Sequence, residues 1–260
     1  MRTPHLFAGA ALAAVGLLVS VAAQAEPTDI TVRVLARDAK FIGTHTGGAR
    51  ITIQDADTGK VLARGLTQGG TGNTERIMQE AHQRGGGLAT EDTAKFDATI
   101  DIDEPTRVRV TAETPAAEGK AGIAVSAEQW VVPGKDLTGG DGWVLEMPGF
   151  LVSVEDAPTT VMLKGGSAAI PLKARITMMC GCPITPGGLW DANSYEVSAI
   201  IKRDGQAAGE STLTYAGKAS EFAGSYTVDR PGTYQATVYA YDPATGNTGV
   251  DKVQFTVSAQ

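Results

Sequence analysis

Residues 96–112 read Phe-Asp-Ala-Thr-Ile-Asp-Ile-Asp-Glu-Pro-Thr-Arg-Val-Arg-Val-Thr-Ala. Two parts of this stretch, 96–102 and 107–112, alternate apolar with polar residues and are rich in β-branched side chains. Successive side chains of a strand point to opposite faces, so a period of two predicts half-buried β-strands. The stretch therefore predicts two neighbouring strands and no helix.

Similar short runs continue on both sides, bounded by Gly, Pro, Asp and Asn. They lie at 30–36, 50–54, 61–64, 123–132, 149–154, 168–177, 194–203, 211–215, 220–228, 233–241 and 250–258. We expect an all-β chain of two β-sandwich domains, 26–156 and 157–260, divided near Ala157. The strand spacing after the division is that of an immunoglobulin-like sandwich.

One stretch, 65–93, interrupts this rhythm. It begins and ends with glycines, and 74–84 between them contains good helix formers. Asn73 or Thr74 is a suitable N-cap, and Gly85 is placed as a C-terminal stop. We expect a long loop carrying one short helix, inserted in the first domain.

The C-terminal end of the chain has turns and strands in a set order. Residues 229–234 form a Pro-Gly-x-Tyr corner, 236–241 a strand, 242–247 an Asp-x-x-x-Gly-Asn turn, and 255–257 a closing strand. This order resembles the end of bacterial Ig-like and PKD-like domains. The resemblance implies a sandwich fold and no particular activity.

In the first domain, residues 48–53 read Gly-Ala-Arg-Ile-Thr-Ile and 57–63 read Asp-Thr-Gly-Lys-Val-Leu-Ala. This pair is similar to carboxypeptidase-regulatory-like and transthyretin-like domains, which implies a β-sandwich. The helical insertion departs from that pattern.

The first 25 residues have the features of a signal peptide. Arg2 is followed by an apolar run from Leu6 to Ala23, and the sequence Ala23-Gln24-Ala25 gives a small-x-small cleavage site. We expect cleavage before Glu26, no remaining membrane anchor, and a periplasmic or secreted protein. Cysteines in such a compartment meet oxidising conditions.

The composition limits the partners. The chain has 22 basic and 29 acidic residues, a net charge of −7, and loss of Arg2 leaves 21 against 29, or −8. This charge argues against nucleic acid or an anionic membrane as the main partner. We expect an unidentified protein partner in the cell envelope.

The strongest chemical signal is Met178-Met179-Cys180-Gly181-Cys182, which follows a predicted strand. In an extended Cys-x-Cys the Cα atoms lie about 6.5–7 Å apart, at the far limit for a disulfide. Gly181 allows a kink that brings the sulfurs closer.

Three states of the cysteine pair are compatible with the sequence. The pair is a strained disulfide, a free dithiol, or two thiolates that bind a soft ion such as copper, with Met178 or Met179 as a thioether ligand. The alternative is a purely structural link, with the two methionines packed on opposite faces of the strand.

A weaker metal pair is Met78 with His82, because residues four apart share one face of a helix. His45 lies in a turn and is expected to be an exposed loop residue. Trp190 is expected to be the buried tryptophan of an Ig-like core, or to pack over the sulfur-rich segment.

Catalytic motifs are lacking in the sequence. The glycine runs do not have the spacing of a phosphate loop, and Gly-x-Ser-x-Gly does not occur. The function expected is a non-enzymatic binding or accessory protein that binds copper or exchanges thiols at the Met-Met-Cys-Gly-Cys segment. The competing hypothesis is a structural or protein-interaction module with a purely structural cysteine pair.

Overall fold

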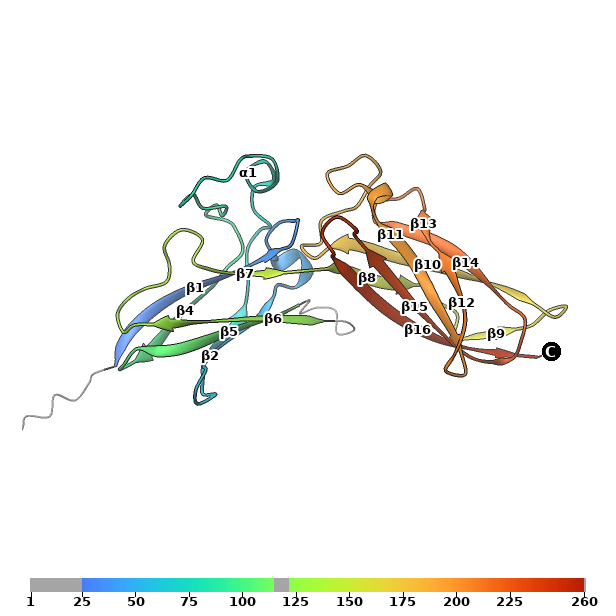
Figure 1. Cartoon of the computed structure of the whole chain (residues 1–260), viewed down its shortest axis with the longest axis horizontal. Helices are drawn as coiled ribbons and strands as arrows, with labels where there is room; N and C mark the ends of the chain where they lie inside the picture. Colours follow the sequence, from blue (N-terminus) through green and yellow to red (C-terminus); the bar gives the residue numbers. More distant parts are fainter. Residues whose placement is uncertain (1–24, 115–121, 260) are drawn as a thin grey trace, which may run out of the picture.

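A computed structural model describes residues 25–114 and 122–259 and is nearly all β-structure (Figure 1). The expected signal peptide lies outside the described residues except for Ala25. No helix within the described ranges is long and apolar enough to cross a membrane. The all-β prediction is confirmed, and the predicted strand 96–102 is found as β4 (Phe96–Ile102).

Two sheets form a first sandwich. One has the order β4-β1-β7, with β1 (Glu26–Ala36) antiparallel to β4 and parallel to β7 (Trp143–Met147). The other has the order β3-β2-β5-β6. Its strands are β2 (Arg50–Asp55), β3 (Val61–Leu66), β5 (Thr106–Thr114) and β6 (Ile123–Val131).

Alternate residues of these strands form the core of the first sandwich. Ile30, Val32 and Val34 of β1 are buried, as are Ile51 of β2 and Val110 of β5. Each such side chain contributes about 1.5–3 kcal/mol on burial. The period of two in the sequence is therefore the alternation between the core and the outer face.

The second sandwich also has two sheets. The order β13-β14-β10-β8 contains β8 (Phe150–Glu155), β10 (Ala168–Met178), β13 (Thr214–Tyr215) and β14 (Glu221–Val228). The order β12-β11-β15-β16-β9 contains β9 (Thr160–Met162), β11 (Glu196–Arg203), β12 (Gln206–Thr212), β15 (Gly232–Tyr241) and β16 (Thr248–Ser258).

This strand order is that of an immunoglobulin-like domain. In such a domain strands A, B, E and D form one sheet and C, F and G the other. Here β8, β10, β14 and β13 take the first set of positions, and β11, β15 and β16 take the second. The predicted Ig-like sandwich is confirmed by this topology.

Tyr234 supplies a second Ig-like feature near the start of β15. Its hydroxyl donates to the Arg230 carbonyl at 3.0 Å, and its ring stacks on Phe255 with centroids 5.4 Å apart. A tyrosine near the start of strand F whose hydroxyl bonds the backbone a few residues upstream is a tyrosine corner. The Pro-Gly-x-Tyr sequence thus fixes the turn between β14 and β15.

The change from one sandwich to the other falls between β7 and β8. β8 pairs with β10, Met178 lying opposite Phe150, so β8 belongs to the second sandwich. The expected division near Ala157 would place this strand in the first domain. The division differs from the expected one because β8 is hydrogen-bonded to β10, a strand that follows it in the sequence. No local sequence pattern reveals such a pairing.

The insertion contains the expected helix, but the helix is shorter than expected. α1 spans Thr74–Met78, and the Asn73 side chain caps it by accepting from the Arg76 backbone N–H at 2.9 Å. The helix does not continue to Gly85. A ring nitrogen of His82 lies 3.0 Å from the Ile77 carbonyl, the group that a further turn of helix would use.

Candidate functional site

The Cys180–Cys182 loop is a tight turn at the end of β10. The Gly181 N–H donates to the Met178 carbonyl at 2.7 Å, and the Met178 N–H donates to the Cys182 carbonyl at 3.1 Å. The two cysteines are joined by a disulfide with Cα atoms 5.4 Å apart. The segment is therefore not an extended Cys-x-Cys, and the kink that the sequence allows at Gly181 is present.

Gly181 makes this turn possible. Its φ of 77° lies in the left-handed region that favours glycine. A Cβ at this position would lie 2.7 Å from Thr46 Cγ2 and 2.8 Å from His45 Cδ2. The loop therefore packs directly against the short 3₁₀ helix η1 (Thr44–Thr46) of the first sandwich.

The four candidate sulfur residues are buried. Cys180 is 0% exposed, Cys182 6%, Met178 0% and Met179 3%. The Tyr195 hydroxyl donates to Met178 Sδ at 3.8 Å, whereas Met179 Cε lies close to Gly149. The two buried thioethers thus pack against different neighbours.

A metal site is not assembled around these residues in this structure. Within the described ranges, no group of three or more His, Cys, Asp or Glu side chains is placed to hold an ion. The sulfurs of Cys180 and Cys182 are bonded to each other, so they are not thiolate ligands in this state. Copper binding stays a prediction for the reduced protein.

The Met78 and His82 pair does not have the geometry expected from the sequence. Met78 is the last residue of α1, and His82 lies beyond the helix end. The pair therefore does not share a helical face. The prediction was wrong because the His82 ring takes the carbonyl that would extend the helix.

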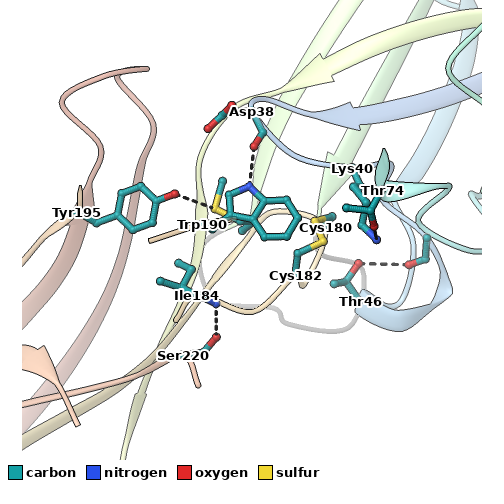
Figure 2. Close-up of a disulfide and its surroundings, with 12 residues drawn as sticks. Asp38, Lys40, Thr46, Thr74, Cys180, Cys182, Ile184, Trp190, Tyr195 and Ser220 are labelled. Atoms are coloured by element: carbon teal, nitrogen blue, oxygen red, sulfur yellow. Dashed lines mark hydrogen bonds between the residues drawn. A yellow bond between two sulfur atoms is a disulfide. The ribbon is translucent and has the colours of Figure 1, made fainter. Parts of the chain in front are cut away.

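Trp190, eight residues after Cys182, links the segment between β10 and β11 to the first sandwich. It is 7% exposed, and its indole N–H donates to the Asp38 carbonyl at 2.8 Å (Figure 2). Trp190 precedes β11 and does not lie in it. It is therefore a tryptophan of the junction between the sandwiches, in place of the expected Ig-like core tryptophan.

Asn247 makes the second polar link across the junction. It is fully buried, and its side-chain oxygen accepts from the Gly149 N–H at 2.9 Å. Its side-chain nitrogen donates to the Arg37 carbonyl at 3.2 Å. Asn247 and Trp190 thus bind consecutive carbonyls of the chain that follows β1.

Burial at the junction shifts three pKa values. The pKa of Asp38 is raised by burial and by the nearby Asp242 carboxylate. Burial, with the charges of Asp242, Asp38 and Asp191, raises the pKa of Tyr195 to about 12. Burial lowers the pKa of Lys40, whose ammonium donates to Thr74 Oγ1 at 3.0 Å.

An open pocket of about 380 Å³ lies beside the Cys180–Cys182 loop. The first sandwich contributes the exposed His45 and the half-buried Thr46, and the outer face of β8 and β10 contributes the opposite wall. We call it the junction pocket. His45 is exposed, as expected, but it also contacts the loop, which the sequence did not indicate.

No protein-family model matches the chain, and no curated protein gives a significant match. Among solved structures, the chain is similar to fibronectin(III)-like modules of Clostridium thermocellum CbhA, with a TM-score of 0.29, 12% identity and coverage of 90% of this chain and 94% of that one. It is also similar to Dpr2 Ig1-Ig2 in a complex with DIP-Theta Ig1-Ig3, with a TM-score of 0.27, 10% identity and coverage of 90% and 99%.

A third similar structure is the tip fimbrial protein Mfa3 of Porphyromonas gingivalis, with a TM-score of 0.32, 9% identity and coverage of 88% of this chain and 81% of that one. Similarity at this level carries no functional conclusion. The Ig-like assignment rests on the strand order and the tyrosine corner described above.

Proposed function

We propose that the chain is a non-enzymatic binding or accessory protein that acts in the periplasm or outside the cell, with Cys180–Cys182 as a structural bond. The observation that carries this proposal is the position of the disulfide loop. Both cysteines are buried, and Gly181 between them packs against the His45–Thr46 turn. A bond in this position restrains a loop between the sandwiches and offers its sulfurs little access to an exchange partner.

The binding role is supported by where the chain places its polar groups. Asn247 and Trp190 are used to hold the two sandwiches together, while sheet faces and loops of both remain exposed. Binding residues commonly lie on loops that a packed scaffold positions. The acidic charge of −7 favours a protein partner in the cell envelope over nucleic acid.

The proposed export is compatible with the position of β1. β1 starts at Glu26, the first residue after the expected cleavage site, and Glu26 pairs with Ile102. Cleavage before Glu26 therefore removes none of the strand. Intact mass of the exported protein tests this point: a chain that begins at Glu26 supports the proposal, and one that retains residues 1–25 contradicts it.

Copper binding and thiol exchange are tested on the same exported protein. We expect the oxidised protein to bind no Cu(I) and to leave a dithiol reporter unchanged, because its sulfurs are buried and bonded. The double variant Cys180→Ser/Cys182→Ser serves as the control and should behave in the same way. Stoichiometric Cu(I) uptake or reporter oxidation by the wild type, lost in the double variant, would overturn the structural role.

A further inference from the structure

The junction pocket is built from both sandwiches. Its lining includes His45, Leu151, Ser153, Arg175, Thr177 and Pro183. At about 380 Å³ it is large enough for a small organic molecule. Because His45 and Gly181 come from different sandwiches, the pocket depends on the contact between them.

One wall of the pocket combines an apolar surface with hydroxyl groups and a cation. On neighbouring strands β8 and β10, Leu151 lies opposite Thr177, and Ser153 lies opposite Arg175. Pro183 extends the apolar part of this wall. A ligand with an apolar body and a polar end would find both surfaces within one cavity.

The charges beside this wall favour a negative ligand. Arg175 Nε donates to Glu155 Oε1 at 3.1 Å, and Nη2 lies 3.8 Å from Glu221 Oε1. Lys173 lies 3.5 Å from each of these carboxylates, and Lys218 lies 2.8 Å from Glu221. Three cations thus share two carboxylates.

This positive excess occurs in a chain whose net charge is −7, so it is a local feature. Within the described residues, Arg175 Nη1 makes no hydrogen bond or ion pair. A guanidinium with an unused N–H edge beside Ser and Thr hydroxyls is suited to a carboxylate or a phosphate.

We propose that the junction pocket binds a small organic anion, with its carboxylate or phosphate on Arg175 and the hydroxyls of Ser153 and Thr177, and its apolar body on Leu151 and Pro183. This inference rests on the proposed binding function and names the class of ligand. The pocket selects the anion over its neutral isostere because the neutral form gives Arg175 no charged partner.

The test is an NMR titration of the disulfide-bonded, exported protein. Benzoate and phenyl phosphate are the anionic probes, and benzamide is the neutral isostere of benzoate. We expect at least one anion to shift the amides of Ser153, Thr177 and Gly181 to saturation, with benzamide binding about tenfold more weakly. The probe that binds more tightly, benzoate or phenyl phosphate, shows whether the pocket prefers a carboxylate or a phosphate group.

Two variants locate the anion within the pocket. Arg175→Gln should weaken binding about tenfold, since it removes a charge-assisted hydrogen bond. Arg109→Gln is the matched control, because Arg109 pairs with Glu128 in the first sandwich and does not line the pocket, and it should change affinity less than about twofold. If Arg175→Gln does not fold, Thr177→Val provides the test and should weaken binding about threefold.

The inference is overturned if no probe gives saturable shifts at these amides, if benzamide binds as tightly as the anions, or if the pocket variants bind as the wild type does. Its failure is distinguishable from failure of the proposed function. A protein with an intact, inaccessible disulfide and an empty pocket retains the structural role of the cysteines, whereas a copper-binding or thiol-exchanging protein does not.

Discussion

The side chain of Asn247 donates to the backbone carbonyl of Arg37 at 3.2 Å, linking two residues 210 positions apart in the sequence. The same side chain accepts from the Gly149 N–H, next to the start of β8. One buried amide therefore holds the end of β1, the passage between the sandwiches and the turn before β16. The Asp-x-x-x-Gly-Asn turn positions it, since Asp242 accepts from the Ala244 N–H and the Thr245 hydroxyl.

We expect Asn247→Ala to destabilise the protein by about 1–3 kcal/mol, because it leaves the buried Gly149 N–H and the partly buried Arg37 carbonyl without a partner. Urea unfolding with a single probe in each sandwich measures the loss. Asn193→Ala is the control, since Asn193 is exposed and bonds only within its own turn, and should cost less than about 0.5 kcal/mol. Equal effects of the two changes would contradict the role of Asn247.

Trp190→Phe should cost about 0.5–1.5 kcal/mol from the lost hydrogen bond to the Asp38 carbonyl, beyond the effect of the smaller ring. Trp130 provides the comparison, because it is 64% exposed on the edge strand β6. Trp130→Phe should leave the free energy of unfolding within about 0.5 kcal/mol. Thermal unfolding of both variants under the same conditions measures the two losses in stability and tests this prediction.

Gly181→Ala tests the contact between the disulfide loop and the first sandwich. Gly187 has a similar φ of 67° but nothing within 4 Å of a built Cβ, whereas the Cβ of residue 181 would meet Thr46 and His45. Both changes carry the cost of about 1–2 kcal/mol for a left-handed alanine. We expect Gly181→Ala to lower the free energy of unfolding by at least about 1 kcal/mol more than Gly187→Ala. Similar losses would mean that the disulfide loop is not packed against the His45–Thr46 turn.

Asp38→Asn should stabilise the protein at pH 7. The pKa of Asp38 is raised by burial and by Asp242, so its ionised form is disfavoured in the folded state. That penalty is present above the folded pKa and disappears as the pH falls below the unfolded pKa, so the advantage of asparagine should vanish there. Asparagine also tolerates the φ of 54° at this position.

Asp191→Asn is a control for which the expected change in stability has the opposite sign to that of Asp38→Asn. Backbone N–H groups of Asn193 and Gly187 lower the pKa of Asp191. Its carboxylate therefore stabilises the folded state at pH values above the unfolded pKa. This stabilisation is lost as the pH falls through the folded pKa. Unfolding free energies from pH 3 to 7 should show the two variants diverging in opposite directions from the wild type, and parallel profiles would contradict the assignment.

Much of the fold could be predicted from the sequence because the outer and inner faces of each strand differ in polarity. The strand 96–102 was predicted with its observed bounds. β7 (Trp143–Met147) was missed, since it is short and adjoins a glycine-rich turn. The helix end at Met78 was also missed, because it depends on a contact with the His82 ring.

The site was predictable in its residues but not in its surroundings. Met-Met-Cys-Gly-Cys indicated a sulfur-rich segment with a kink at Gly181, and the structure has that kink. That this turn packs on His45, and that Trp190 reaches Asp38, depends on chain segments more than a hundred residues away. Local patterns contain no information about contacts of that kind.

The state of Cys180 and Cys182 in the exported protein tests the central claim most directly. Mass spectrometry after alkylation, with and without denaturant and reductant, distinguishes bonded, free and metal-bound sulfur. The structural role predicts no alkylation in native or denatured protein, and two alkylated cysteines only after reduction. Alkylation of either cysteine without reductant, or a mass that retains copper, would contradict it.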